Sequence, residues 1–162
     1  MMGSGKTTAG RAVAEALGRP LVDSDEQVEA RTGRTVREIF ESEGEPAYRI
    51  LEREALLAAL DAAEPSVVAA AGGVVLDPEN RAALRRAGTV VWLRARPEAL
   101  AGRVEGGQDH RPLLADDALA TLTRLEGERR RLYEEVADQV VDVDDLDPST
   151  VAARILALVA RR

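Results

Sequence analysis

The sequence predicts a three-layer α/β fold with a parallel sheet, and two features of its pattern support this prediction. Short apolar runs alternate along the chain with longer segments whose apolar residues recur at helical spacing. One run, residues 66–71, is almost continuously apolar, which is typical of a strand covered on both faces. Because helices must then cover both sides of the sheet, we expect a single α/β domain over residues 1–162.

The first half of the chain shows the alternation clearly. After residue 8, Ala9, Val13 and Leu17 recur at helical spacing, and Gly18 followed by Pro20 ends that helix. The elements predicted next are a strand at 20–23, two short helices within 26–42 that are separated at Thr32-Gly33, a helix from about 47 to 63, and the apolar strand at 66–71.

The second half repeats the pattern, and proline and aspartate mark its helix starts. Helical segments are predicted to start at Asp77-Pro78, Pro97 and Asp147-Pro148, because proline suits the first helical position and aspartate can cap a helix N-terminus. The predicted elements are helices at 77–86, 97–104 and 117–136, strands at 89–93 and 139–143, and a closing helix after 147.

Composition excludes several classes of function. Apolar residues make up 45% and charged residues 31%, as in a globular domain with its own core. The formal charge of −7 argues against nonspecific binding to nucleic acid or to an anionic membrane, and without cysteine there is no disulfide or thiolate chemistry. No apolar run approaches the length of a membrane span, and no secretory signal is visible. We expect a cytoplasmic, monomeric enzyme.

The residues before the first helix form most of a phosphate-binding P-loop, G-x-x-x-x-G-K-[ST]. In this motif backbone amides surround the phosphates, the lysine adds positive charge and the final hydroxyl reaches Mg²⁺. The second half of the motif is present, but its first glycine would fall one position before Met1, so we expect a short apolar strand and a glycine upstream. The alternative is a chance glycine turn at a helix start. The residues concerned are Gly3, Ser4, Gly5, Lys6, Thr7 and Thr8.

Polar residues and glycines follow the two predicted strands of the first half. Asp23 and Asp25 are expected to project to the same side of an extended chain, at the strand end where ligands bind in open α/β sheets. Two carboxylates so close favour a nearby cation or arginine. Gly72 and Gly73 allow a ligand to approach the backbone. The alternatives are a solvated turn with Asp25 as a helix cap and, at the glycines, an ordinary tight turn.

Two arginines are placed unfavourably unless an anion lies nearby. Arg49 falls in the first turn of a helix, where a cation is disfavoured, although an exposed arginine paired with Glu45 or Glu52 is the alternative. Arg129 occupies the core-facing stripe of its helix, so it needs an anionic partner or must extend its guanidinium into water. The stripe consists of Leu122, Leu125, Leu132 and Val136.

The stretch 105–116 interrupts the alternation of elements. Gly106-Gly107 precede a polar segment that contains Arg111, which suits a lid closing over bound phosphates, and a plain surface connection is the alternative. His110, the single histidine, has no second histidine or cysteine beside it to complete a metal site. We therefore expect His110 to be a solvated loop residue.

Taken in order, these motifs closely resemble those of the shikimate kinase family. They are the P-loop at 3–8, Asp-Ser-Asp at 23–25, Thr-Gly-Arg at 32–34, Gly-Glu-Pro-Ala-Tyr-Arg at 44–49, Gly-Gly at 72–73, Arg-Pro-Leu-Leu at 111–114, and Arg129 ahead of Leu132-Tyr133. The P-loop alone would indicate only a nucleotide-binding protein, and the combination is far more specific. The resemblance implies the P-loop kinase fold, with a parallel sheet in the order 2-3-1-4-5 whose first strand is missing from this chain.

The resemblance also implies an activity: ATP-dependent phosphorylation of the shikimate 3-hydroxyl, giving shikimate 3-phosphate and ADP in aromatic amino acid biosynthesis. Lys6 and the loop amides would hold the phosphates, Thr7 would bind Mg²⁺, and Asp23 would support the metal through water. Asp25 would bind the substrate hydroxyls and accept or orient the reacting proton. Arg111 would join the ATP phosphates when the lid closes.

The same resemblance assigns the substrate carboxylate to Arg49 and Arg129, and a planar guanidinium does match a carboxylate in a bidentate pair. Gly72 and Gly73 would present backbone to the ring. The family commonly has a third glycine where this chain has Ala71, and it often offers an arginine to the adenine near the last strand, where residues 143–146 offer none. Two alternatives stay open: another small-molecule P-loop kinase, such as a gluconate or nucleotide kinase, and a nucleotide-binding module without turnover.

Overall fold

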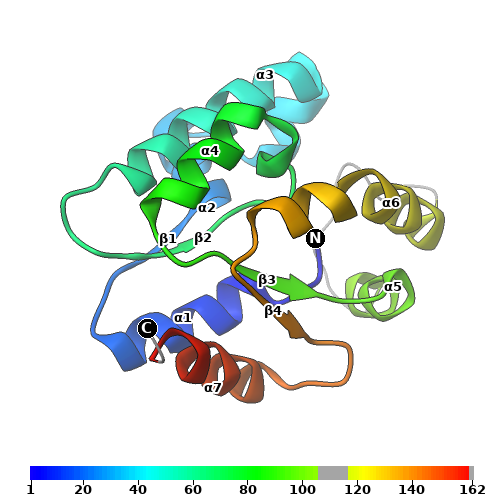
Figure 1. Ribbon diagram of the computed structural model, residues 1–162. Coiled ribbons are helices and arrows are strands. Elements are labelled where there is room, and N and C mark those ends of the chain that lie inside the picture. Colours follow the sequence, from blue (N-terminus) through cyan, green and yellow to red (C-terminus); the bar gives the residue numbers. More distant parts are fainter. Residues whose placement is uncertain (106–116, 161–162) are drawn as a thin grey trace.

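The computed structural model describes residues 1–105 and 117–160 and has the predicted three layers. Strands form the middle layer, with α2, α3 and α4 on one side and α1 and α7 on the other, while α5 and α6 lie together at one end (Figure 1). In chain order the elements are α1 (Lys6–Leu17), β1 (Leu21–Asp23), α2 (Ser24–Thr32), α3 (Val36–Leu60), β2 (Val67–Ala69), the 3₁₀ helix η1 (Val74–Leu76), α4 (Pro78–Ala87), β3 (Val91–Arg94), α5 (Pro97–Glu105), α6 (Ala118–Val136), β4 (Gln139–Asp142) and α7 (Pro148–Val159).

The strands form two parallel pairs, β1 with β2 and β3 with β4. Asp23 lies opposite Ala69 in the first pair, and Val91 lies opposite Gln139 in the second. In the expected order 2-3-1-4-5, β1 and β2 correspond to strands 2 and 3, and β3 and β4 correspond to strands 4 and 5. The two observed pairs are thus the pairs that the expected order has on either side of its first strand. The carboxyl ends of β1 and β2 therefore lie together, and the predicted site residues follow them.

Aspartate caps begin the helices where the sequence predicted. The side chains of Asp77, Asp117 and Asp147 each accept hydrogen bonds from backbone amides in the first turn of α4, α6 and α7. The predicted break at Thr32-Gly33 is also present, because Gly33 ends α2 with a left-handed conformation (φ 67°). Helix starts and stops of this kind depend on neighbouring residues only, so they could be predicted reliably.

Two local features add detail to the prediction. Within α3, Val36–Leu60, two helical stretches meet at a kink at Gly44 (φ 82°, ψ 173°), which lies in the break that the sequence predicted between residues 42 and 47. Proline at 46 lacks an amide hydrogen, but it falls in the first turn after Gly44, where no helical hydrogen bond is lost. The other feature is η1, a 3₁₀ turn after Gly73 that the sequence pattern did not indicate.

The core consists mainly of Ala, Val and Leu, as the few aromatic residues require. Three of the aromatic side chains are nevertheless buried: Tyr48, Trp92 and Tyr133. Trp92 and Tyr133 stack with ring centroids 5.4 Å apart, which joins β3 to α6. A smaller cluster of Val28, Ile39, Tyr48 and Ala55 packs α2 against α3. These two contacts hold α3 and α6, the helices that carry the predicted arginines.

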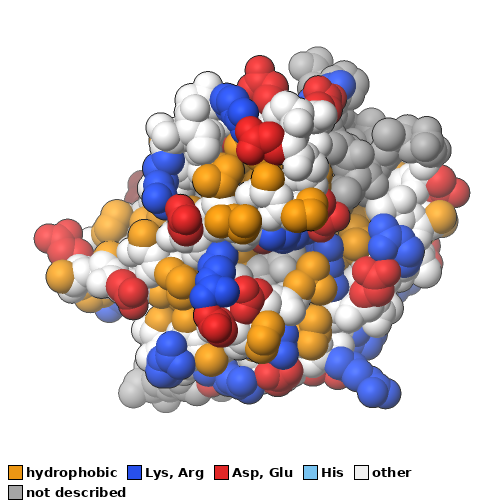
Figure 2. Space-filling view, turned by 90° about the horizontal axis from the view of Figure 1, so that it is seen from above, with side chains coloured by type: hydrophobic (Ala, Val, Ile, Leu, Met, Phe, Trp, Pro, Cys, Tyr) orange, Lys and Arg blue, Asp and Glu red, His pale blue; other side chains and the backbone are white. Residues whose placement is uncertain are grey.

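The surface is mixed in charge. Figure 2 shows acidic and basic side chains interspersed with hydrophobic ones over the face that it presents. Among the described residues, no helix combines the length and the apolar character that crossing a bilayer requires.

Candidate active site

A cavity of about 390 Å³ brings together six of the residues predicted to form the site. Its walls come from the chain's first residues, α1, α2, α3, the loop after β2, and α6. A volume of this order is in the range of small-molecule sites. The six predicted residues in its lining are Lys6, Asp25, Arg49, Gly72, Gly73 and Arg129.

The P-loop has the backbone conformation that its glycines allow. Gly3 (φ 74°) and Gly5 (φ 78°) both adopt left-handed conformations, and α1 begins directly after Gly5. The hydroxyl of Ser4 and the amine of Lys6 each donate a hydrogen bond to the carbonyl oxygen of Met1, at 2.9 and 3.0 Å. The loop therefore curls around the start of α1, and the unpaired amides at a helix N-terminus suit an anion.

Thr7 and Asp23 meet beside this loop. The Thr7 hydroxyl donates to Oδ2 of Asp23 at 2.6 Å, while Oδ1 of Asp23 accepts the amide of Asp25 at 2.9 Å. A hydroxyl and a carboxylate are the hard oxygen donors that Mg²⁺ prefers, and Mg²⁺ usually takes its other ligands from phosphate and water. Within the described residues, no group of three or more His, Cys, Asp or Glu is placed to hold a metal alone. The donors fit a Mg²⁺ ion that arrives with a nucleotide.

Asp25 does not lie on the strand beside Asp23, so the expectation that both project from an extended chain is wrong. Asp23 caps α2, and Asp25 lies in the first turn of that helix. The cap turns the backbone after β1, which directs Asp25 into the cavity while Asp23 faces Thr7. The helix cap is therefore Asp23, and not Asp25 as the alternative interpretation had it.

Arg49 pairs with both glutamates named as its possible partners, yet it also lines the cavity. Its Nη1 lies 2.8 Å from both carboxylate oxygens of Glu52, and its Nη2 lies 2.6 Å from Glu45. Burial opposes the charged form, but the attraction of the two carboxylates outweighs it and raises the pKa of Arg49. Burial also raises the pKa of Glu52, whose side chain is 2% exposed. The arginine is thus held in place as a cation.

The structure shows a steric reason for glycine at position 73, which the sequence did not reveal. A Cβ atom at this position would overlap Nη1 and Cζ of Arg49 and lie 2.7 Å from Nη2. Real Cβ atoms essentially never come closer than 3.0 Å to another heavy atom. The missing side chain therefore lets the Arg49 guanidinium lie against the backbone after β2.

Gly72 is fixed by α6. Its carbonyl oxygen accepts a hydrogen bond from the Tyr133 hydroxyl at 2.6 Å, and a Cβ atom there would lie 3.1 Å from that hydroxyl oxygen. Burial raises the pKa of Tyr133, so the phenol stays protonated and able to donate. On the strand side, the buried Ser24 hydroxyl accepts the amide of Ala71 at 2.9 Å. These bonds fix the segment of backbone that lines the cavity.

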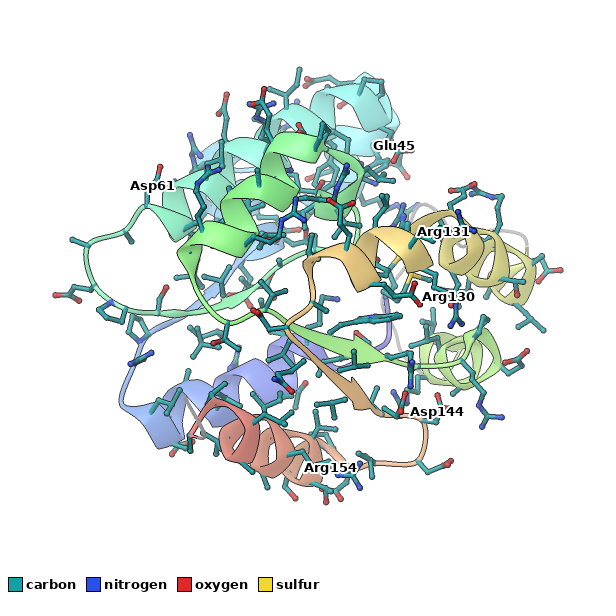
Figure 3. All side chains as sticks on the ribbon, in the orientation of Figure 1. Glu45, Asp61, Arg130, Arg131, Asp144 and Arg154 are labelled. Carbon is teal, nitrogen blue, oxygen red and sulfur yellow. The ribbon has the colours of Figure 1, made fainter. Side chains whose placement is uncertain are left out.

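Arg129 is 5% exposed, so the alternative in which its guanidinium reaches into water is wrong. Its Nε atom is buried and has no hydrogen-bond partner within residues 1–105 and 117–160. A buried guanidinium donor of this kind requires an acceptor, and an anion in the cavity would supply one. The next residues of α6, Arg130 and Arg131, are exposed, and Arg130 pairs with Glu126 (Figure 3).

Several residues contribute to the site although the sequence assigned them no part in it: Ser24, Tyr48, Glu52, Arg103 and Tyr133. Arg103 of α5 donates to the carbonyl oxygen of Gly3 at 3.4 Å and to that of Asp144 at 2.8 Å, so it ties the P-loop to the segment after β4. Helical spacing did point to Glu52 as a partner of Arg49, and Ser24, Tyr48 and Tyr133 stand in the motifs, but the contacts that Ser24, Tyr48, Arg103 and Tyr133 make are with partners far along the chain, which no local signal reveals. Arg111, His110 and the predicted lid around 105–116 lie outside the described residues, except for the end of α5.

The fold and the cavity define a P-loop kinase that acts on a small anionic molecule. A family model described as shikimate kinase matches residues 2–160. The chain belongs to the shikimate kinase family, which confirms the resemblance stated from its motifs.

Individual shikimate kinases are similar to this chain over nearly its whole length. The shikimate kinase of Symbiobacterium thermophilum is 46% identical over 100% of this chain and 94% of its own length. That of Pseudomonas syringae pv. tomato is 42% identical over 98% of this chain and 92% of its own length. A solved shikimate kinase from Acinetobacter baumannii, in complex with shikimate, has a TM-score of 0.93 and 34% identity over 99% of this chain and 89% of that one. The enzyme from Aquifex aeolicus has a TM-score of 0.82 and 31% identity over 99% and 92%.

Proposed function

We propose that the cavity is where this protein transfers the terminal phosphoryl group of ATP to the 3-hydroxyl of shikimate, giving shikimate 3-phosphate and ADP. The observation that carries the assignment is the convergence of Lys6, Asp25, Arg49 and Arg129, from four helices, on one cavity. The lysine of the P-loop, a carboxylate and two guanidinium groups all contribute to its lining. Arg129 is buried and Arg49 is half-buried, and two guanidinium groups of this kind favour a small hydroxy acid over a nucleotide as the acceptor.

The arginines account for the choice of an acidic substrate. In our proposal Arg49 and Arg129 hold the substrate carboxylate, with Gly72 and Gly73 beside the ring. Arg49 is supported by Glu52 and Arg129 by its burial, so neither guanidinium has to be ordered when the substrate binds. Binding an anion between prearranged donors lowers the entropic cost of association. Local positive charge of this kind acts despite a net charge of −7.

Asp25 and Lys6 carry the chemistry in this proposal. Asp25 accepts the proton of the 3-hydroxyl, the hydroxyl oxygen bonds to the γ-phosphorus, and the bond from that phosphorus to the β–γ bridging oxygen breaks, which releases ADP. Phosphoryl transfer needs mainly positioning and positive charge around the moving group, and Lys6 supplies such a charge from the P-loop. Arg111 would add a second charge from the lid segment.

The remaining P-loop residues bind the nucleotide. Amides of Gly3, Ser4, Gly5, Lys6, Thr7 and Thr8 surround the phosphates at the start of α1. Thr7 and Asp23 would hold Mg²⁺, Asp23 through water, and the ion would screen the phosphate charge while bound. This assignment leaves Oδ1 of Asp23 as the cap of α2, so metal binding and the placement of Asp25 depend on one side chain.

We propose further that the protein works as a monomer in the cytoplasm and has no nucleic-acid or membrane partner. The net charge of −7 supports the last two statements, since both partners are polyanionic. Light scattering behind size exclusion would test the first, with an expected mass near that of one chain, 17.4 kDa. A dimer mass at working concentration would contradict it.

A coupled assay of ADP formation tests the proposed reaction. We expect turnover with shikimate and none with gluconate or nucleoside monophosphates, and phosphorus NMR should place the product phosphate on the 3-hydroxyl. Asp25→Asn should lower kcat by roughly 10²–10⁴-fold, the usual contribution of a general base. Glu26→Gln is the matched control, because Glu26 is the next residue of α2 and its side chain is 61% exposed. Equal activity of both variants would refute the role of Asp25.

A further inference from the structure

The hydroxyl of Tyr48 makes a short hydrogen bond with Oδ1 of Asp25. Tyr48 is on α3, 23 residues away in sequence, and its side chain is 3% exposed. Both residues line the cavity. Within residues 1–105 and 117–160, this phenol is the one hydrogen-bond donor found for the Asp25 carboxylate. None of the roles proposed above uses it.

The ring of Tyr48 is fixed on two sides. Phe40 packs against it with ring centroids 4.7 Å apart, and the Cζ atom of Arg49 lies 5.4 Å from its centroid. Val28 and Ile39 belong to the same buried cluster. A side chain held in this way has few rotamers to choose from, so the position of its hydroxyl is set before any substrate arrives.

The phenol acts as the donor in this bond. Burial raises the pKa of Tyr48 above its usual value, and the carboxylates of Asp25 and Glu52 raise it further. A phenol that keeps its proton cannot remove one from the substrate, so Tyr48 is not the base. An ionised carboxylate accepts only, and the hydrogen bond from a neutral phenol therefore occupies one of its two oxygens.

We propose that the Tyr48 hydroxyl is a positioning residue for Asp25, holding Oδ1 so that Oδ2 meets the reacting hydroxyl of the substrate. This inference rests on the role proposed for Asp25. A carboxylate at the start of a helix can rotate about two side-chain bonds, and tethering one oxygen from a rigid neighbouring helix removes that freedom. Small displacements of a reacting group are costly, with losses that can reach about 100-fold for 1 Å. Tyr48 would act only through Asp25.

Tyr48→Phe tests the proposal because it removes the hydroxyl and keeps the ring against Phe40. We expect kcat/KM for shikimate to fall by about 10-fold, as for loss of one hydrogen bond to a charged group, with KM for ATP unchanged. The melting temperature should stay within a few degrees of the parent protein, since the cluster around the ring remains. An unchanged kcat/KM for shikimate would overturn the proposal.

A double-mutant cycle separates positioning from packing. We expect shikimate affinity, measured by calorimetry without turnover, to fall in Tyr48→Phe and in Asp25→Asn, and to fall no further when both are combined. If the effect of Tyr48→Phe persists at full size in the Asp25→Asn background, Tyr48 acts through another group and the inference is wrong. If Asp25→Asn alone leaves kcat and affinity intact, it is the role of Asp25 in the proposed function that fails.

Discussion

Replacing Gly73 by alanine tests whether the position of the Arg49 guanidinium controls substrate binding. Gly73 has φ −87° and ψ −15°, a conformation that alanine adopts without strain, so the backbone should not change. The new Cβ atom would overlap Nη1 and Cζ of Arg49, and the far end of that side chain must move away. The variant therefore displaces one guanidinium and leaves its charge intact.

The size of the effect follows from this geometry. Nη2 would lie 2.7 Å from the new Cβ atom, where at least 3.0 Å is needed, and Nη1 and Cζ lie closer still. A displacement on the order of 1 Å is thus required, and misplacement of that size can cost about 100-fold. We expect kcat/KM for shikimate to fall by about 10- to 100-fold. The pair with Glu45 can persist, because the Glu45 side chain is partly exposed and can follow the shifted guanidinium.

Coupled ADP assays at varied shikimate and ATP measure the two substrates separately. The loss should appear in KM for shikimate, while KM for ATP stays constant, since the proposal assigns Arg49 to the substrate carboxylate and the ATP phosphates to the P-loop. Gly127→Ala is the matched control: a Cβ atom at Gly127 meets no atom within 4 Å, and this glycine lies on the exposed side of α6. If Gly73→Ala binds shikimate as well as Gly127→Ala does, the Arg49 guanidinium does not bind the substrate as proposed.

Two further predictions concern the other arginine and the acid stability of the fold. Arg129→Lys keeps the charge but loses the bidentate geometry, so KM for shikimate should rise by roughly 10-fold with little change in KM for ATP, and an unchanged KM for shikimate would count against the proposed contact. Hydrogen bonds from Ser149 and Thr150 lower the pKa of Asp147 in the folded state below its ordinary value of 3.8. The ionised Asp147 therefore contributes its full stabilisation of the fold above pH 3.8, and this stabilisation is lost as the pH falls through the folded-state pKa. Asparagine also caps a helix but does not titrate. The urea concentration at the unfolding midpoint should therefore fall less between pH 5 and pH 3 for Asp147→Asn than for the parent protein, and equal falls would contradict this account.

Local signals determined much of this protein. The glycines and the lysine of the P-loop, the aspartate caps of α4 and α7, and the inward position of Arg129 all follow from spacings of a few residues. Such spacings reflect the helical repeat and the unpaired amides at helix starts, which are the same in any fold. For that reason the α/β class, the family and six residues of the cavity could be predicted before any coordinates were known.

The tertiary structure decided how those residues are held. Asp25 was expected on an extended segment and lies on a helix, because the side chain of Asp23 caps α2, which begins two residues earlier than predicted. Glu52 was named only as a surface partner of Arg49 and is in reality buried beneath it. The contact of Tyr48 with Asp25 joins two helices whose separation no sequence spacing encodes. Hydrogen bonds and steric contacts between distant segments depend on how the layers pack, and the sequence pattern of each element alone does not specify that packing.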